Sequence, residues 1–257
     1  MSRQAPPGDH ASVVRAAFAR QARGFARSDL QRDPGRLARL IDFLGSRPGE
    51  RVLDVACGPG IVTAALEHAG RLTFGIDLTR EMIREAATQR GRYVQGDVAL
   101  LPFRDSTFDV AVCRSSFHHF DHPQAIMNEM TRVVRREGRV VIEDLRAPDD
   151  ERKRAYHETI ERLRDESHTR TLSRDEFREM AAEAGLSGFD DVPLTLVIDF
   201  DEWIDRGGPT PENRERARSM MEACVVKDLC GLKVWKEGDR LKFERQSLLF
   251  RAARPPR

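Results

Sequence analysis

The stretch Val52-Leu53-Asp54-Val55-Ala56-Cys57-Gly58-Pro59-Gly60 decides the fold of this chain. An apolar run of strand-forming residues leads directly into a turn that contains two glycines. Glycine has no Cβ and tolerates positive φ, so such a turn lets backbone approach a ligand that any other side chain would push away. We therefore expect a strand, a tight turn and the binding site of a nucleoside-bearing cofactor. A glycine turn after a strand is also a common structural corner, so its meaning depends on the elements that come after it.

The next two elements narrow the choice of cofactor. An apolar helical stretch, residues 61–69, precedes a second strand, residues 72–76, which ends in Asp77. A carboxylate about 20 residues past the glycines binds ribose in dinucleotide folds, so this position alone would also allow NAD. The dinucleotide fingerprint, however, has glycine at its sixth position under a pyrophosphate, and this chain has Thr63 there.

A third strand, residues 93–95, runs into Gly96-Asp97-Val98. Acidic residues thus follow or end three successive strands, at Asp54, Asp77 and Asp97. Such a series of carboxylates suits a positively charged adenosyl ligand without phosphate, whereas it would repel a pyrophosphate.

These motifs, in this order, resemble the class I S-adenosylmethionine-dependent methyltransferases, and most closely the small-molecule group that includes the ubiquinone and menaquinone C-methyltransferases. The matching segments are VLDVACGPG (52–60), GIDLTREMI (75–83), QGDVALLPFRDSTFDVAVCRSSFHHF (95–120) and GRVVIEDL (138–145). Their order is more specific than any one of them. One departure is Ala56, which stands where the family has the first of three glycines and leaves the turn at Gly58–Gly60 intact.

The resemblance implies S-adenosyl-L-methionine as the cofactor, with S-adenosyl-L-homocysteine as its product. It implies that Asp77 binds the ribose hydroxyls, that Asp97 and Val98 flank the adenine, and that the backbone of residues 114–116 lies under the methionine part. The full set expected at the cofactor is Phe25, Asp54, Ala56, Gly58, Gly60, Asp77, Leu78, Met82, Gly96, Asp97, Val98, Arg114 and Ser115. For Asp54 an alternative is that it holds the glycine turn by accepting hydrogen bonds from backbone amides.

Apolar runs without strict alternation, in residues 52–56, 108–113 and 140–142, indicate strands that are buried on both faces. We expect an α/β fold: a Rossmann-like open sheet of about seven strands, mostly parallel with an antiparallel last strand, helices on both faces and a helical substrate cover. The expected division is a disordered start and lid helix in residues 1–35, the cofactor-binding core in 36–145, and completion of the sheet with helical cap insertions in 146–257.

Periodicity and turn residues predict further elements. Helical spacing joins Val14, Phe18 and Phe25, and a clearer stripe runs from Leu37 to Leu44. The remaining expected helices are at 81–90, from Pro123 to near Gly138, at 149–166, from the capping box Ser173–Glu176 to Gly185, and at 210–230. Two further strands are expected at 192–200 and 241–252. The chain ends, at 1–10 and 254–257, are expected to be disordered.

Composition limits the partners. The chain has 257 residues and a net charge of +1, so it has no long-range field that would attract nucleic acid or an anionic membrane. Its four cysteines fall at no metal-ligand spacing and suggest no disulfide framework, so we expect no metal and a reducing cytoplasm. No secretion signal or membrane-spanning stretch is evident, and a monomer and a homodimer are equally compatible.

A methyltransferase must hold an acceptor atom in line with an activated methyl group and exclude water, and a base helps when the acceptor is a phenol, enol or amine. Candidates lie at the ends of strands four and five, where ligands bind in parallel sheets. They are His118, His119 and Glu143, with Asp144 beside it, and each of these has packing or capping as its alternative role. Phe18 and His168 are the candidate substrate contacts, with core packing and a polar helix-end turn as alternatives.

Three functions remain open. The first is methylation of an O, N or C atom of a small molecule. Methylation of RNA or protein is less favoured, because no basic domain is attached and Arg114-Ser-Ser-Phe117 stands where amino-directed nucleic-acid enzymes carry Asn/Asp-Pro-Pro-aromatic. The third is a non-catalytic module that binds S-adenosylmethionine.

Overall fold

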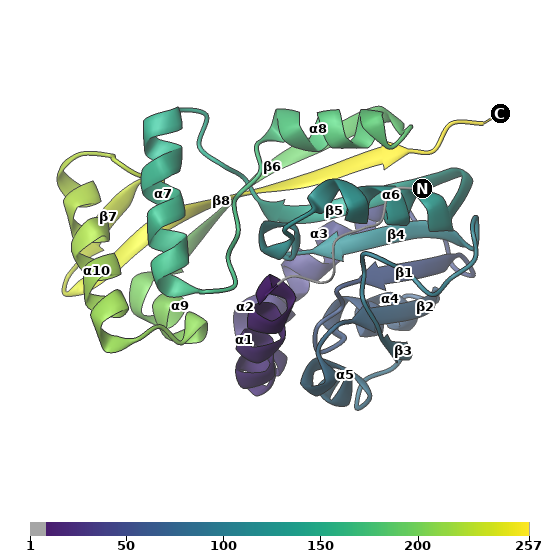
Figure 1. The fold of residues 1–257 in the computed structure, drawn as a ribbon, viewed down its shortest axis with the longest axis horizontal. Helices are drawn as coiled ribbons and strands as arrows, with labels where there is room; N and C mark the ends of the chain where they lie inside the picture. The colour runs from purple at the N-terminus through teal and green to yellow at the C-terminus, as the bar shows by residue number, and fades with distance from the viewer. Residues whose placement is uncertain (1–8, 257) are drawn as a thin grey trace.

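The computed structural model describes residues 9–256, which form a mixed sheet of eight strands with helices on both faces (Figure 1). The strands are β1 (Arg51–Val55), β2 (Leu72–Asp77), β3 (Arg92–Gln95), β4 (Phe108–Arg114), β5 (Val134–Leu145), β6 (Ser187–Asp199), β7 (Val234–Glu237) and β8 (Arg240–Ala253). Their order is β3-β2-β1-β4-β5-β8-β6, with β7 paired to β8. Strands β1 to β5 pair in parallel, and β8 is antiparallel to β5, β6 and β7. The predicted Rossmann-like sheet is confirmed.

Helices cover the two faces with separate apolar layers. The helices are α1 (Asp9–Ala26), α2 (Asp29–Arg32), α3 (Pro34–Leu44), α4 (Ile61–His68), α5 (Arg80–Ala86), the 3-10 helix η1 (Phe117–His119), α6 (Pro123–Val133), α7 (Glu151–Arg164), α8 (Arg174–Glu183), α9 (Phe200–Gly207) and α10 (Pro211–Val226). On one face Leu40 of α3 and Leu66 of α4 pack against the sheet. On the other, Met127 of α6 and Phe177 of α8 form the larger core. Burial of these stripes is what fixes the helices against the strands.

A third apolar cluster, separate from the layers on the two faces of the sheet, lies beyond the end of the parallel strands. It joins α7, α9, α10 and β7 to the outer parts of β6 and β8, and Trp203, Met221 and Phe243 are fully buried in it. We call this unit the cover. In Figure 1 it stands at the left, and β6 and β8 run from it into the sheet of the core at the right.

Helix α1 lies between the core and the cover. It contacts α5 of the core and α9 of the cover. Gln21 donates a hydrogen bond to the carbonyl of Gly207 at 3.1 Å, and Arg20 forms an ion pair with Glu166, just after α7. The helix therefore touches both sides of the junction, below the sheet in Figure 1.

Several predicted boundaries are wrong. The helix from Pro123 ends at Val133, because strand β5 begins at Val134 and continues past Glu137, which has φ +62°. Two consecutive β-branched residues favour this change to strand. The helix predicted at 81–90 spans only Arg80–Ala86.

The segment around β6 also differs from expectation. The strand predicted at 192–200 begins at Ser187 and ends at Asp199, whose carboxylate caps α9 by accepting hydrogen bonds from the amides of Asp201 and Glu202. Pro193 is tolerated inside this strand because β6 is the edge of the sheet. Helices α2 and α9 and strand β7 were not predicted.

At the chain ends, the expected disorder is wrong where the structure describes them. His10 lies in α1, and the amide of Arg254 donates to the carbonyl of Gly138 at 2.8 Å. The rest of that expectation, residues 1–8 and 257, lies outside the described residues. The capping box is confirmed, since the Ser173 hydroxyl accepts from the Glu176 amide at 3.2 Å and the Glu176 carboxylate accepts from the Ser173 amide at 2.7 Å. Over residues 9–256 no helix combines the length and the apolar character needed to cross a membrane.

Candidate cofactor and acceptor site

The glycine turn is closely fitted between β1 and α4. Ala56, Gly58 and Gly60 have φ of +55°, +53° and +78°. A Cβ added at Gly60 would lie 2.6 Å from the hydroxyl of Tyr93, whereas one at Gly58 would meet nothing closer than the Met82 sulfur at 3.9 Å. Backbone at Gly58 is therefore open to a ligand, as the sequence predicts for a cofactor turn.

Asp54 supports this turn from inside the protein. Its Oδ2 accepts hydrogen bonds from the Thr63 amide at 3.0 Å and the Thr63 hydroxyl at 2.7 Å. The residue is 2% exposed, and burial raises the pKa of its carboxyl to about 6. Asp54 thus ties β1 to the first turn of α4, which is the alternative role considered for it.

Asp77 lies at the carboxyl end of β2, beside the same turn. Its two carboxylate oxygens accept hydrogen bonds from the amides of Gly58, at 2.9 Å, and Thr79, at 2.8 Å. Each carboxylate oxygen has a second lone pair, so the group can still accept from ribose hydroxyls. Burial raises the pKa of Asp77, and a bound donor would stabilise its charged form.

The third strand end completes this edge of the sheet. The exposed Asp97 accepts a hydrogen bond from the Ala99 amide at 2.8 Å, and the next residue, Val98, is buried. The Gly96 amide donates to the carbonyl of Asp77 at 2.9 Å, so the ends of β2 and β3 are held together. Leu78 accepts a hydrogen bond from Gln95 through its carbonyl at 3.2 Å.

The loop after β4 carries both backbone and side-chain groups into the junction. Ser115 has φ +55°, and its amide donates to the carbonyl of Glu143 at 2.7 Å. Arg114 donates to the carbonyl and the side chain of Gln31 at 2.8 and 2.6 Å. Glu143, one of the predicted bases, is buried in an ion pair of 2.7 Å with Arg36, which occupies its carboxylate.

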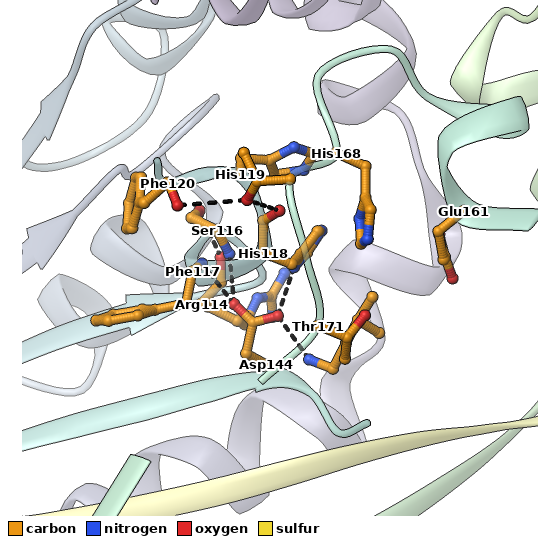
Figure 2. A network of polar contacts seen from close by, with 12 residues as sticks. Arg114, Ser116, Phe117, His118, His119, Phe120, Asp144, Glu161, His168 and Thr171 are labelled. Carbon is orange, nitrogen blue, oxygen red and sulfur yellow. Dashed lines mark hydrogen bonds and ion pairs between the residues drawn. The ribbon is translucent and has the colours of Figure 1, made fainter. Parts of the chain in front are cut away.

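Asp144, not Glu143, is the carboxylate that contacts the histidines (Figure 2). Its Oδ2 accepts from the amides of Ser116 and Phe117 at 2.9 and 2.6 Å, and its Oδ1 lies 2.5 Å from Nδ1 of His118. Burial alone would raise the pKa of Asp144, but His118 and the amides of Leu145 and Phe117 lower it overall. A carboxylate at Nδ1 fixes the proton there, so His118 presents the lone pair of Nε2.

His119 is held by the segment after α7. Nδ1 of His119 lies 3.0 Å from the carbonyl oxygen of Ser167 and 3.1 Å from the hydroxyl oxygen of the same residue. The Ser167 hydroxyl donates a hydrogen bond to the Asp165 carboxylate at 2.6 Å. A carbonyl can only accept, so Nδ1 carries the proton here as well. Burial, followed by the neighbouring His118, lowers the pKa of His119 to about 3 and keeps it neutral at physiological pH.

The remaining predicted acceptor contacts gather around these two rings. Phe18 of α1 meets His119 edge-on at 4.9 Å between ring centroids and lies 5.9 Å from Phe25. The ring of His168 is 5.6 Å from that of His118, and its Nε2 lies 2.9 Å from Glu158 of α7. Figure 2 shows the three histidines side by side above Asp144. The structure thus brings His118, His119, His168 and Phe18 together.

The sequence named Asp144 only beside Glu143, and it did not assign Glu158 or Asp165 to the histidines. Glu158 of α7 is brought to His168 by the fold, whereas Asp165 lies two residues before Ser167 and accepts its hydrogen bond locally. One signal existed for Asp144, because it ends a parallel strand where ligands bind. Another was the polar segment at residues 165–168, which lies next to a charged helix.

Comparison with known proteins agrees with this geometry. The model of a methyltransferase domain family matches residues 53–142. The methyltransferase YcgJ of Bacillus subtilis (strain 168) is 35% identical over 187 residues, which cover 70% of this chain and 74% of that protein. The crystal structure of YcgJ superposes with a TM-score of 0.79 over 86% of this chain and 98% of that one. A demethylmenaquinone methyltransferase of Corynebacterium kroppenstedtii is 29% identical over 48% of this chain and 66% of its own length. The glycine turn, the carboxylates at the strand ends and these relatives together place the chain in the class I S-adenosylmethionine-dependent methyltransferases.

Proposed function

We propose that this enzyme methylates a small molecule enclosed between the core and the cover. The observation that carries this proposal is the burial of the histidine cluster. His118, His119 and His168 are 5%, 6% and 4% exposed, beneath α1 and beside α7. A folded protein or a duplex nucleic acid does not reach side chains at this depth, whereas a metabolite enclosed by the junction does.

In this proposal the cofactor is held by the residues that the sequence singles out. Asp77 accepts from the ribose hydroxyls, Asp97 and Val98 flank the adenine, and the Gly58–Gly60 turn and the Ser115 backbone contact the rest. The bound cofactor supplies an activated methyl group, and the protein supplies position and exclusion of water. The four cysteines are free and buried.

His118 is the base of the proposed reaction, for an acceptor whose nucleophilic atom carries a proton. Its Nε2 holds a lone pair, and Asp144 at Nδ1 stabilises the imidazolium that forms when the proton arrives. His119 is a poorer base because its pKa is held near 3 by burial and by His118, so it serves as a neutral hydrogen-bond partner. Asp144 is a positioning residue.

The test is methyl transfer from isotopically labelled S-adenosylmethionine into a fractionated cell extract. We expect label in a small metabolite, and we expect His118→Gln to lower kcat by about 10²- to 10⁴-fold with an unchanged affinity for S-adenosylhomocysteine. His122→Gln, at an exposed histidine four positions away, is the matched control. Label in RNA or protein would instead support macromolecular methylation. Binding of S-adenosylhomocysteine without labelling of any fraction would favour the non-catalytic module.

A further inference from the structure

Five arginine side chains gather where the core meets the cover. They come from five different elements: Arg36 from α3, Arg114 from β4, Arg164 from α7, Arg206 from α9 and Arg245 from β8. Arg245 is an electrostatic neighbour of Arg164, Arg36 and Arg206, and Arg114 is a neighbour of Arg36. We call this group the arginine cluster.

Three carboxylates, Glu143, Glu161 and Asp165, form ion pairs with the arginine cluster, but they engage only two of its five members. Glu143 is taken by Arg36 at 2.7 Å. Glu161 lies 3.9 Å from Arg164 but is also 3.4 Å from His157. Within residues 9–256, Arg114, Arg206 and Arg245 form no ion pair within 4.0 Å.

Two donors of the cluster are buried without a partner. Arg114 is 9% exposed, and its Nη1 makes no hydrogen bond in the described part of the chain. The same holds for Nε of Arg245. A buried guanidinium donor without an acceptor is costly, and proteins normally pair such groups. Burial lowers the pKa of Arg245 to about 10, and the neighbouring arginines add to this shift while Glu161 opposes it.

The cluster adjoins the proposed acceptor site. Arg114 pairs in register with Glu143, the residue before Asp144, and it precedes His118 by four residues. Figure 2 draws Arg114 in the same close view as Asp144 and the histidines, with Glu161 of α7 at its right-hand side. On β8, Arg245 shares a strand face with Leu241 and Phe243, which pack in the cover. Arg114 therefore ends the strand that leads into the proposed base, Arg245 lies on the strand that runs into the cover, and both are electrostatic neighbours of Arg36.

We propose that the methyl acceptor carries an anionic oxygen group, a carboxylate or a phosphate, and that Arg114 and Arg245 bind this group. The inference rests on the proposed function, since it specifies the acceptor of that same site. Guanidinium groups suit both anions because their planar donors match paired oxygens. An anion here would supply acceptors for the two buried donors.

Calorimetry on the protein saturated with S-adenosylhomocysteine tests this inference. The cofactor product already contributes its own amino-acid carboxylate, so any further anion must occupy another position. The probes are malonate, inorganic phosphate and, as the uncharged counterpart of malonate, malonamide, at constant ionic strength. We expect saturable binding of at least one anion and none of malonamide. Malonate alone would identify a carboxylate, and phosphate alone would identify a phosphate group.

The variants are Arg245→Gln and Arg114→Gln, with Arg240→Gln as the control. Arg240 lies on the same strand, is exposed, and forms ion pairs with Asp199 and Glu202. Loss of a charged hydrogen bond should weaken anion binding by about tenfold or more in the first two variants and leave the control unchanged.

Three results would overturn the inference: no anion binding by the loaded protein, equal binding of malonamide, or an equal loss of S-adenosylhomocysteine affinity in Arg245→Gln. The last would assign the arginine cluster to the cofactor's carboxylate. Failure of the wild-type protein to bind S-adenosylhomocysteine would instead refute the proposed function itself.

Discussion

Asp77 combines a structural and a binding role in one carboxylate. It already accepts hydrogen bonds from two amides and has lone pairs left for the ribose. We expect Asp77→Asn to weaken S-adenosylhomocysteine binding by about ten- to hundredfold, because hydrogen bonds to a charged acceptor contribute about 1.5–3 kcal/mol. Calorimetry measures this loss, with Asp239→Asn in the turn after β7 as the control. An unchanged affinity would contradict the assignment of Asp77 to the ribose.

His119 makes the stability of the fold depend on pH. Its pKa is about 3 in the folded protein, against 6.5 as its ordinary value. Because the unfolded chain binds a proton at His119 more readily than the folded protein does, the contribution of His119 to stability is complete above pH 6.5. It is lost as the pH falls toward the folded pKa of about 3. Between about pH 7 and about pH 5 this amounts to about 2 kcal/mol.

When the pH is lowered from about 7 to about 5, the free energy of unfolding should therefore fall by about 2 kcal/mol less in His119→Gln than in the wild-type protein. Denaturant unfolding at the two pH values measures the difference, and His122→Gln is the control because that histidine is exposed. Equal acid sensitivity of His119→Gln and the wild type would show that His119 is not held neutral by the fold.

At the level of single residues, the sequence predicted best what is local. Asp77, Asp97 and the glycine turn follow strands directly, so their positions follow from the strand ends. Glu158 and Asp165 come near His118 and His119 only because α7 packs beside the core. No spacing in the sequence contains that information. Glu143 was predicted as a base and is instead engaged by Arg36.

Among the elements, the turn between β1 and α4 gives the most direct test. Gly60 has φ +78°, and a Cβ there would lie 2.6 Å from the Tyr93 hydroxyl. Gly238 has φ +60°, but a Cβ added there would meet nothing within 4 Å, so Gly238→Ala isolates the cost of the backbone conformation, about 1–2 kcal/mol. We expect Gly60→Ala to lower the free energy of unfolding by more and also to weaken cofactor binding. Equal losses in thermal unfolding would show that Tyr93 moves away without cost.

Element boundaries were predicted well where capping signals are strong. Helix α8 begins at the predicted capping box, and α10 follows Thr210, whose hydroxyl accepts from the Asn213 amide. The change from α6 to β5 was missed because residues 133–138 carry no proline and only a late glycine. Strand β7 is only four residues long and gains its partners from β8, so its sequence gave little periodicity.

For the whole molecule, α1 is the element that links the core and the cover on the side of the acceptor site. It contacts α5 and α9, and Phe18 reaches His119. We expect S-adenosylhomocysteine to slow amide hydrogen exchange in α1, because Phe25 and its neighbours gain a ligand to pack against. Exchange in α8, on the opposite face of the sheet, serves as the reference. Equal changes in α1 and α8 would show that the ligand stabilises the molecule uniformly.

Strand β8 also sets how the enzyme can open. Its last residues pair with β5 in the middle of the sheet, and its first residues pair with β7 under the cover helices. One continuous ladder of hydrogen bonds along β6 supports it over most of its length. Because both strands run from the core into the cover, we expect these two parts to be held to each other more firmly than either is held to α1. We expect the methyl acceptor and the product to pass where the amino-terminal helix moves aside, since this helix is held to the cover through side chains such as Gln21 and Arg20.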